Sequence, residues 1–198
     1  MSVQPVKTYP TIACCGLDCG LCPRYYTVGT SKCPGCCGQD FFNKHPSCSY
    51  ITCCVKKKQL EVCAQCDEFP CTKFDSSILD GGEYDSFLTY KKAYQNLTFI
   101  RNHGVKKFVE QQNQRIKLLT IMLNNFDEGR SKSFYCLAAT LLPIESIEHA
   151  LDETNQKLKI DHSKGNNRKT KAKMLKAILN DLAAKAEIEL KLRKKPQK

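Results

Sequence analysis

Large hydrophobic side chains recur every three or four residues in the second half of the chain, as they do in helices that bury one face. Between Phe87 and Ile100 this spacing predicts a helix, and Gly104 is suited to end it. Between Val105 and Phe126 the same spacing predicts a second helix.

Three further helices are predicted from the residues that favour helix ends. Ser131 or Ser133 could cap a short helix that runs through Leu142. Pro143 is suited to the first position of the next one, which continues to about residue 159. A polar linker at 161–167 then precedes a last helix, predicted at about 170–193.

The N-terminal part has a different pattern. Residues 14–71 show little helical or alternating periodicity, contain few large aliphatic side chains, and place prolines and glycines beside cysteines. Such a segment cannot offset its ordering entropy by hydrophobic burial alone. The sequence therefore predicts a mainly α protein with an irregular, metal-stabilised cysteine-rich N-terminal module.

Composition divides the 198 residues into three zones and excludes several classes of protein. We expect a metal-binding module at 1–80, a helical domain at 81–160, and a linker with a basic C-terminal helix at 161–198. A 41% share of hydrophobic residues excludes a disordered chain. No run approaches the roughly 18 apolar residues of a membrane span. No signal peptide is visible, so a cytoplasmic location is expected.

Cysteine is the residue type that sets this sequence apart. The chain contains 14 cysteines, and all but Cys136 lie between Cys14 and Cys71. A reducing compartment keeps them as thiols. Three Cys-x-x-Cys pairs, at residues 19/22, 33/36 and 63/66, have the spacing that lets one tight turn present two sulfurs to one ion.

These cysteines predict two or three structural zinc ions held by thiolates. The candidate ligands are Cys15, Cys19, Cys22, Cys33, Cys36, Cys48, Cys53, Cys54, Cys63, Cys66 and Cys71. Their grouping into sites stays open. His45 is a further candidate ligand or a solvated side chain, and Cys14 and Cys37 are spare thiols.

Two other uses of the same cysteines remain open. The spacing of Cys15, Cys19 and Cys22 could hold three corners of an iron–sulfur cluster, which would make the protein a redox carrier. The second alternative is a thiol enzyme that uses the same cysteines. Cys136 is either a buried core residue or a reactive thiol that could take part in such chemistry.

The cysteine motifs resemble a known family. The run from Cys15 to Cys22 and Pro23, the Cys33–Cys36 pair, and the closing stretch Cys63-Ala-Gln-Cys66-Asp-Glu-Phe-Pro-Cys71 are similar to domain of unknown function 3795. The resemblance covers about residues 12–80. It implies a prokaryotic, cysteine-rich, zinc-binding domain and implies no reaction. The family pattern has one cysteine where this chain has both Cys53 and Cys54.

The charge distribution and the sequence motifs restrict the functions that the protein could have. The net charge is +11, and residues 157–198 hold 14 basic and 4 acidic side chains. This basic end could bind nucleic acid, but it contains no aromatic residue for stacking on bases. It could also dock on the protein's own metal module, because zinc held by four thiolates is anionic. Common nucleotide-binding and metalloprotease motifs are absent from the sequence. The interpretation we favour is therefore a non-enzymatic zinc protein that binds a protein partner or acts as a scaffold.

Overall fold

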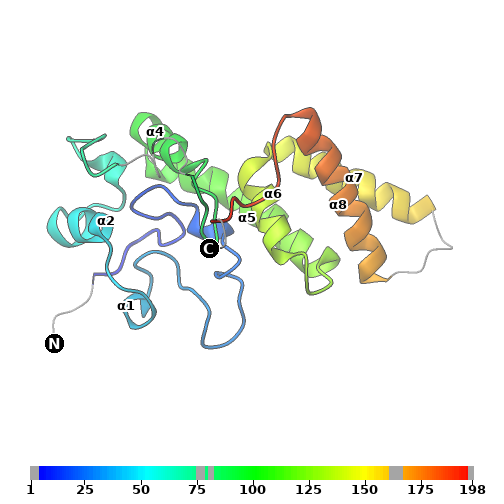
Figure 1. The fold of residues 1–198 in the computed structure, drawn as a ribbon, viewed down its shortest axis with the longest axis horizontal. Helices are drawn as coiled ribbons and strands as arrows, with labels where there is room; N and C mark the ends of the chain where they lie inside the picture. Colours follow the sequence, from blue (N-terminus) through cyan, green and yellow to red (C-terminus); the bar gives the residue numbers. More distant parts are fainter. Residues whose placement is uncertain (1–4, 75–78, 80–82, 161–166, 196–198) are drawn as a thin grey trace. The chain divides into compact units, whose positions relative to one another are not determined.

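A computed structural model describes residues 5–74, 79, 83–160 and 167–195. These residues are mainly helical and include no β-strand (Figure 1), which confirms the predicted class. The chain forms two compact units. Unit 1 comprises the described residues up to Gln112 and those from Leu192 onward, and unit 2 is Asn113–Lys191.

The cysteine-rich part of unit 1 is irregular, as predicted, and contains only short helical pieces. They are a 3-10 turn at Cys19–Leu21, helix α1 at Phe41–Lys44, helix α2 at Ser49–Ile51, a π-helical segment at Thr52–Lys57, and a 3-10 turn at Cys63–Gln65. The rest of the described chain between residues 5 and 74 consists of turns and loops.

Five longer helices come after these pieces. They are α4 at Ala93–His103, α5 at Val105–Phe126, α6 at Lys132–Leu141, α7 at Ile144–Ile160 and α8 at Arg168–Lys185. The three central helices, α5 to α7, match the predicted ranges to within one or two residues. Gly104 ends α4 with a positive φ of 85°, the backbone conformation for which glycine was expected there.

The prediction was wrong at the start of the first helix and at the end of the last. Helix α4 begins at Ala93, and Phe87 is 62% exposed in the loop before it. Helix α8 stops at Lys185 because Glu187 takes a left-handed φ of 56° and the amide of Ile188 donates back to the carbonyl of Ala183. Most of the predicted linker, 161–166, lies outside the described residues.

The chain after α8 returns to unit 1 and is fixed there by Arg193. Its guanidinium and backbone amide donate to the carboxylate of Asp85, with a shortest distance of 2.7 Å, and its carbonyl accepts from the amide of Asp85. The Asp85 side chain is fully buried. This contact joins the tail to Asp85, which lies outside the predicted metal module at 1–80, so docking of the basic tail on that module stays a prediction. Helix α8 itself belongs to unit 2.

The core of unit 1 has two parts. One packs Ile12, Val62 and Phe74 against the apolar faces of α4 and the beginning of α5. The other is small, and half of its buried members are thiols; it consists of Ala13, Cys14, Cys36, Cys37, Phe41, Ile51, Cys54 and Val55. The cysteine-rich module is thus packed on α4, which lies beyond its predicted boundary.

Gly16 shows how close this packing is. It has a φ of +88°, and a Cβ atom built on it would lie 2.1 Å from the carbonyl oxygen of Ala93 at the start of α4. The Asn96 amide group, one turn further, donates to the Gly16 carbonyl at 2.9 Å. The loop that carries Cys15 and Cys19 is therefore held against α4.

Unit 2 has an aliphatic core. Helix α6 is buried from Tyr135 to Leu141, and α7 and α8 pack together through residues such as Ile147 and Leu179. Cys136, on α6, is 1% exposed, which supports its interpretation as a core residue. No helix among the described residues is long and apolar enough to cross a membrane.

Candidate metal centre

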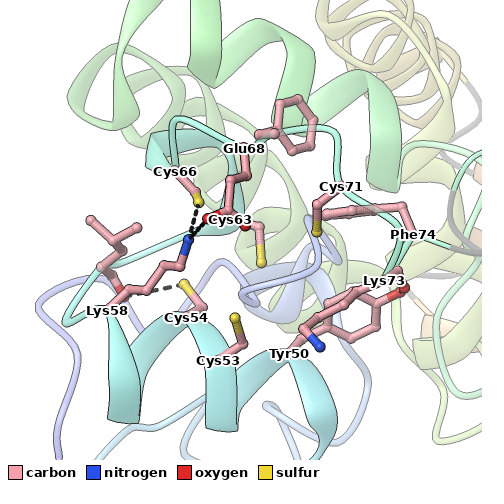
Figure 2. Close-up of a pocket in the computed structure, with 12 residues that line it drawn as sticks. Tyr50, Cys53, Cys54, Lys58, Cys63, Cys66, Glu68, Cys71, Lys73 and Phe74 are labelled. Carbon is pink, nitrogen blue, oxygen red and sulfur yellow. Dashed lines mark hydrogen bonds and ion pairs between the residues drawn. The ribbon is translucent and has the colours of Figure 1, made fainter.

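Five of the predicted ligands line one small pocket. We call it the second thiol pocket, because its cysteines come later in the chain than those of the other thiol pocket. These are Cys53, Cys54, Cys63, Cys66 and Cys71. Figure 2 shows the sulfurs of Cys53, Cys63 and Cys71 turned toward the same space. That space has a volume of about 40 Å³. It is large enough for an ion or a few water molecules but too small for a metabolite.

Two chain segments bring these thiols together. Cys53 and Cys54 lie on the π-helical segment, and the 3-10 turn at Cys63–Gln65 presents Cys63 and Cys66 from the opposite side (Figure 2). Arg101 of α4 holds this turn by donating to the carbonyls of Ala64 at 3.2 Å and Cys66 at 3.1 Å.

Lys58 places a positive charge at the rim of the second thiol pocket. Its Nζ lies 3.0 Å from the Sγ of Cys66 and 2.8 Å from the carboxylate of Glu68 (Figure 2). Hydrogen bonds to Glu68 and Cys66 raise the pKa of Lys58, and the same contact lowers the pKa of Glu68. The ammonium thus bridges the Cys66 sulfur and the Glu68 carboxylate at the edge of the pocket.

A first thiol pocket gathers most of the remaining cysteines. It is lined by Cys14, Cys15, Cys19, Cys33, Cys36 and Cys48, together with His45. Its volume is about 250 Å³. Gly35, between Cys33 and Cys36, has a φ of +84°, and a Cβ atom built on it would lie only 2.3 Å from the carbonyl oxygen of Pro10, so no larger residue fits there.

Neighbouring thiols and burial control the charge of this first pocket. Burial raises the pKa of Cys15 to about 12 and also raises that of Cys19. Hydrogen bonds from Cys14 and Cys37 lower the pKa of Cys36, and the Sγ atoms of Cys14 and Cys36 are 4.0 Å apart. Cys36 is therefore the preferred thiolate of this cluster.

Lys7 is buried beside the same cluster. It is 5% exposed, and its ammonium donates to the carbonyl of Ile12. Its charge acts to lower the pKa of Cys36, after the larger effect of the neighbouring thiols, and it opposes the effect of burial on Cys19. A buried ammonium requires compensation by negative charge, and thiolates are the nearby groups that can supply it.

Ten of the eleven predicted ligands line one of the two pockets. Cys22 lines neither, although its electrostatic contacts with Cys19 and Cys33 place it near the first. Cys14, predicted as spare, lines the first pocket, as does His45, whose ring also stacks on Phe41. Cys37 is fully buried in the core.

The sequence did not reveal Lys7 and Lys58. Lys58 is the last of three consecutive lysines, and nothing in that run separates it from its neighbours. Lys7 stands alone before the first cysteine. Only the fold brings each of them to a thiol.

Each pocket is lined by several potential metal ligands, but these side chains do not have the geometry of a complete metal site. Among the described residues, no three Cys, His, Asp or Glu side chains lie close enough to share one ion. The donor set nevertheless suits a soft or borderline metal such as zinc, because thiolates are its strongest protein ligands. The metal itself is therefore a proposal.

Compared with known protein families, with curated proteins and with solved structures, the chain gives no significant match. The resemblance to domain of unknown function 3795 therefore stays a prediction, and the function has to be inferred from the residues of this chain alone.

Proposed function

We propose that unit 1 binds two zinc ions, one in each thiol pocket, and that these ions hold its loops in shape for an interaction or scaffold role. The observation that carries the proposal is that five cysteines line the second thiol pocket and that three of them, Cys53, Cys63 and Cys71, turn their sulfurs toward the same space (Figure 2). Cysteines placed for packing alone are not expected to gather in this way.

The protein groups around the pockets support thiolate chemistry. At each pocket a lysine interacts with a thiol: Lys7 acts on Cys36, and Lys58 contacts the Cys66 sulfur. Zinc with four thiolates carries a net charge of −2, which a neighbouring ammonium offsets in part. Each Sγ changes position when its χ1 angle changes rotamer, so an ion would select the rotamers that converge on it.

A structural role suits these pockets better than catalysis. A site in which thiolates fill all four positions has none left for water or substrate. The volume of about 40 Å³ in the second pocket also favours a single ion over a bound metabolite. We place the protein in a reducing compartment such as the cytoplasm, where its thiols stay available.

Metal analysis of protein purified without oxygen tests the proposal. We expect two zinc ions per chain, one of which is lost in Cys63→Ser/Cys66→Ser and the other in Cys15→Ser/Cys19→Ser. Cys136→Ser is the control, because Cys136 is buried in unit 2 and should leave the zinc content unchanged.

Two results would contradict this assignment. Stoichiometric iron and sulfide with visible absorption would identify an iron–sulfur protein. A folded protein that contains no metal and is indifferent to chelator would remove the metal altogether. If the serine variants fail to fold, cobalt titration of the wild-type protein still counts the tetrahedral thiolate sites from their absorption bands.

A further inference from the structure

Unit 2 carries two adjoining open hollows that are rich in positive charge, which together we call the basic groove. One hollow, of about 810 Å³, is lined by Leu123, Asp127, Glu128, Gly129, Arg130, Asn167, Arg168 and Lys169. The other, of about 750 Å³, is lined by Glu128, Lys169, Thr170, Lys173, Met174, Lys176 and Ala177. Because Glu128 and Lys169 line both, the two hollows adjoin each other.

The two carboxylates in the basic groove are engaged locally. Asp127 accepts hydrogen bonds from the backbone amides of Gly129 and Ser131, both at 3.0 Å. Glu128 accepts from the hydroxyl of Ser131 and pairs with Lys176 at 3.3 Å. These contacts lower the pKa of Glu128, with the Ser131 hydroxyl as the largest contributor. Both carboxylates thus serve the turn between α5 and α6.

The other cations of the groove keep their charge available. Among the described residues, no carboxylate forms an ion pair with Arg130, Arg168, Lys169 or Lys173. Arg168 donates a hydrogen bond to the carbonyl of Asn124, a neutral group that does not compensate its positive charge. Lys169 and Lys173 are exposed and lie one turn apart on the same face of α8.

We propose that the basic groove binds the sugar–phosphate backbone of duplex nucleic acid, independently of sequence. Arginine and lysine are the side chains that contact phosphates, and arginine does so through two parallel hydrogen bonds. Among the residues that the structure describes, no aromatic side chain lines the groove, so these residues offer no surface on which unpaired bases could stack. This favours a duplex over a single strand.

A membrane surface fits the same charges less well. Helices that lie on membranes insert an exposed apolar face between their cations. In α8 that face is already used, because Leu175 and Leu179 are fully buried and Ile178 is 9% exposed. Of the described residues that line the hollows, only Leu123 and Met174 have large apolar side chains.

The test measures how the affinity of the full chain for a labelled duplex of arbitrary sequence depends on salt concentration. Fluorescence anisotropy of the duplex reports binding. If four cations each neutralise one phosphate, affinity falls about 150-fold between roughly 50 and 200 mM salt. In Arg130→Gln/Lys169→Gln/Lys173→Gln the fall over that range should shrink to about fourfold. Circular dichroism of the helices checks that the variant folds. We expect it to fold, because the three substituted residues are exposed.

The control variant is Lys157→Gln/Lys159→Gln/Lys185→Gln, which removes the same charge from exposed residues of α7 and α8 outside the groove. It should keep the steep salt dependence of the wild type. Equal losses in both variants would overturn the proposal in favour of diffuse attraction by net charge. Failure of the wild type to bind duplex at low salt, or equally tight binding to anionic vesicles or polyglutamate, would overturn it as well.

Discussion

Units 1 and 2 bury different kinds of side chain. Unit 2 buries leucine, isoleucine, alanine and tyrosine on the facing sides of regular helices. In unit 1, half of the buried members of the smaller core cluster are cysteines, carried by turns and short helical pieces. A thiol removes much less apolar area from water than a leucine side chain does. Hydrophobic burial therefore accounts for the order of unit 2 more fully than for that of the cysteine-rich loops.

The same contrast separates two kinds of buried cysteine. Cys136 lies within a helix whose neighbouring residues are leucines, alanines and aromatics, and it behaves as a small hydrophobic residue. Cys14 and Cys36 are buried as well, but they contact each other and Cys37 and influence one another's ionisation. The neighbours of a cysteine, rather than its burial, therefore distinguish a core thiol from a candidate metal ligand.

The largest effect we predict is local unfolding on metal removal. A strong chelator should abolish hydrogen-exchange protection of the cysteine-rich loops, residues 14–71, because structural zinc contributes on the order of 10 kcal/mol to such modules. Helices α6, α7 and α8 should keep their protection, since an aliphatic core stabilises them. Exchange measured by mass spectrometry on the full chain resolves the two regions.

Added zinc should restore protection of the same loops, whereas magnesium, which prefers oxygen ligands, should not. Loss of protection in both units together would show that they unfold as one. Unchanged protection of residues 14–71 would show that the loops are ordered without metal.

The contrast between the units also explains how far the sequence predicts the fold. In α5, α6 and α7 the hydrophobic spacing alone gave helix ranges close to those observed, because each of these helices buries a periodic stripe. The prediction failed where a tertiary contact overrides the pattern. The aromatic spacing that includes Phe87 extends the predicted helix into a loop that Asp85 and Arg193 hold in place.

The sequence identifies candidate ligands but not how they are grouped in space. Cys-x-x-Cys spacing identifies thiols that can share a turn, and ten of the eleven candidates do line a pocket. Which turns face each other depends on contacts between distant segments, such as Arg101 with the Cys66 carbonyl. Lys7 and Lys58 have no local signal, because a lysine near a thiol in space leaves no spacing in the sequence.

The second prediction compares two glycines that both have positive φ. Gly16→Ala should destabilise unit 1 by roughly 3 kcal/mol or more, because a left-handed alanine is strained and its Cβ would overlap the Ala93 carbonyl. Gly29 has a φ of +84° with no atom near its Cβ position. Gly29→Ala should therefore cost only about 1 kcal/mol. Urea unfolding of the two variants measures the difference, and equal losses would show that the contact with α4 contributes nothing.

The third prediction concerns the return of the chain to unit 1. Arg193→Met should lower the free energy of unfolding by about 2 kcal/mol, because it leaves the buried carboxylate of Asp85 without its guanidinium partner. The value is below that of a fully buried pair, since Arg193 is 27% exposed. Lys194→Met, at the exposed neighbouring residue, should stay within about 0.5 kcal/mol of the wild type in urea unfolding.

Acid weakens the same contact. Burial opposes the charge of Asp85, but hydrogen bonds from Arg193 and the amide of Tyr90 outweigh it, so the pKa of Asp85 is lowered in the folded chain. The contribution of the pair is therefore complete above about pH 5 and declines as the pH falls through the folded pKa. The stability difference between wild type and Arg193→Met should shrink from pH 7 toward about pH 3, and a constant difference would argue against an ionic contact.

The smallest effect is expected at the rim of the second thiol pocket. Lys58→Met should weaken zinc binding there about tenfold, because it removes the ammonium that contacts the Cys66 sulfur at 3.0 Å. Lys57→Met removes the same charge from the adjacent exposed residue and should leave zinc affinity unchanged. Competition with a chromophoric chelator measures both affinities. Equal affinities for the two variants would show that Lys58 acts only through net charge, and recovery of tight binding in Lys58→Arg would show that a cation at this position is sufficient.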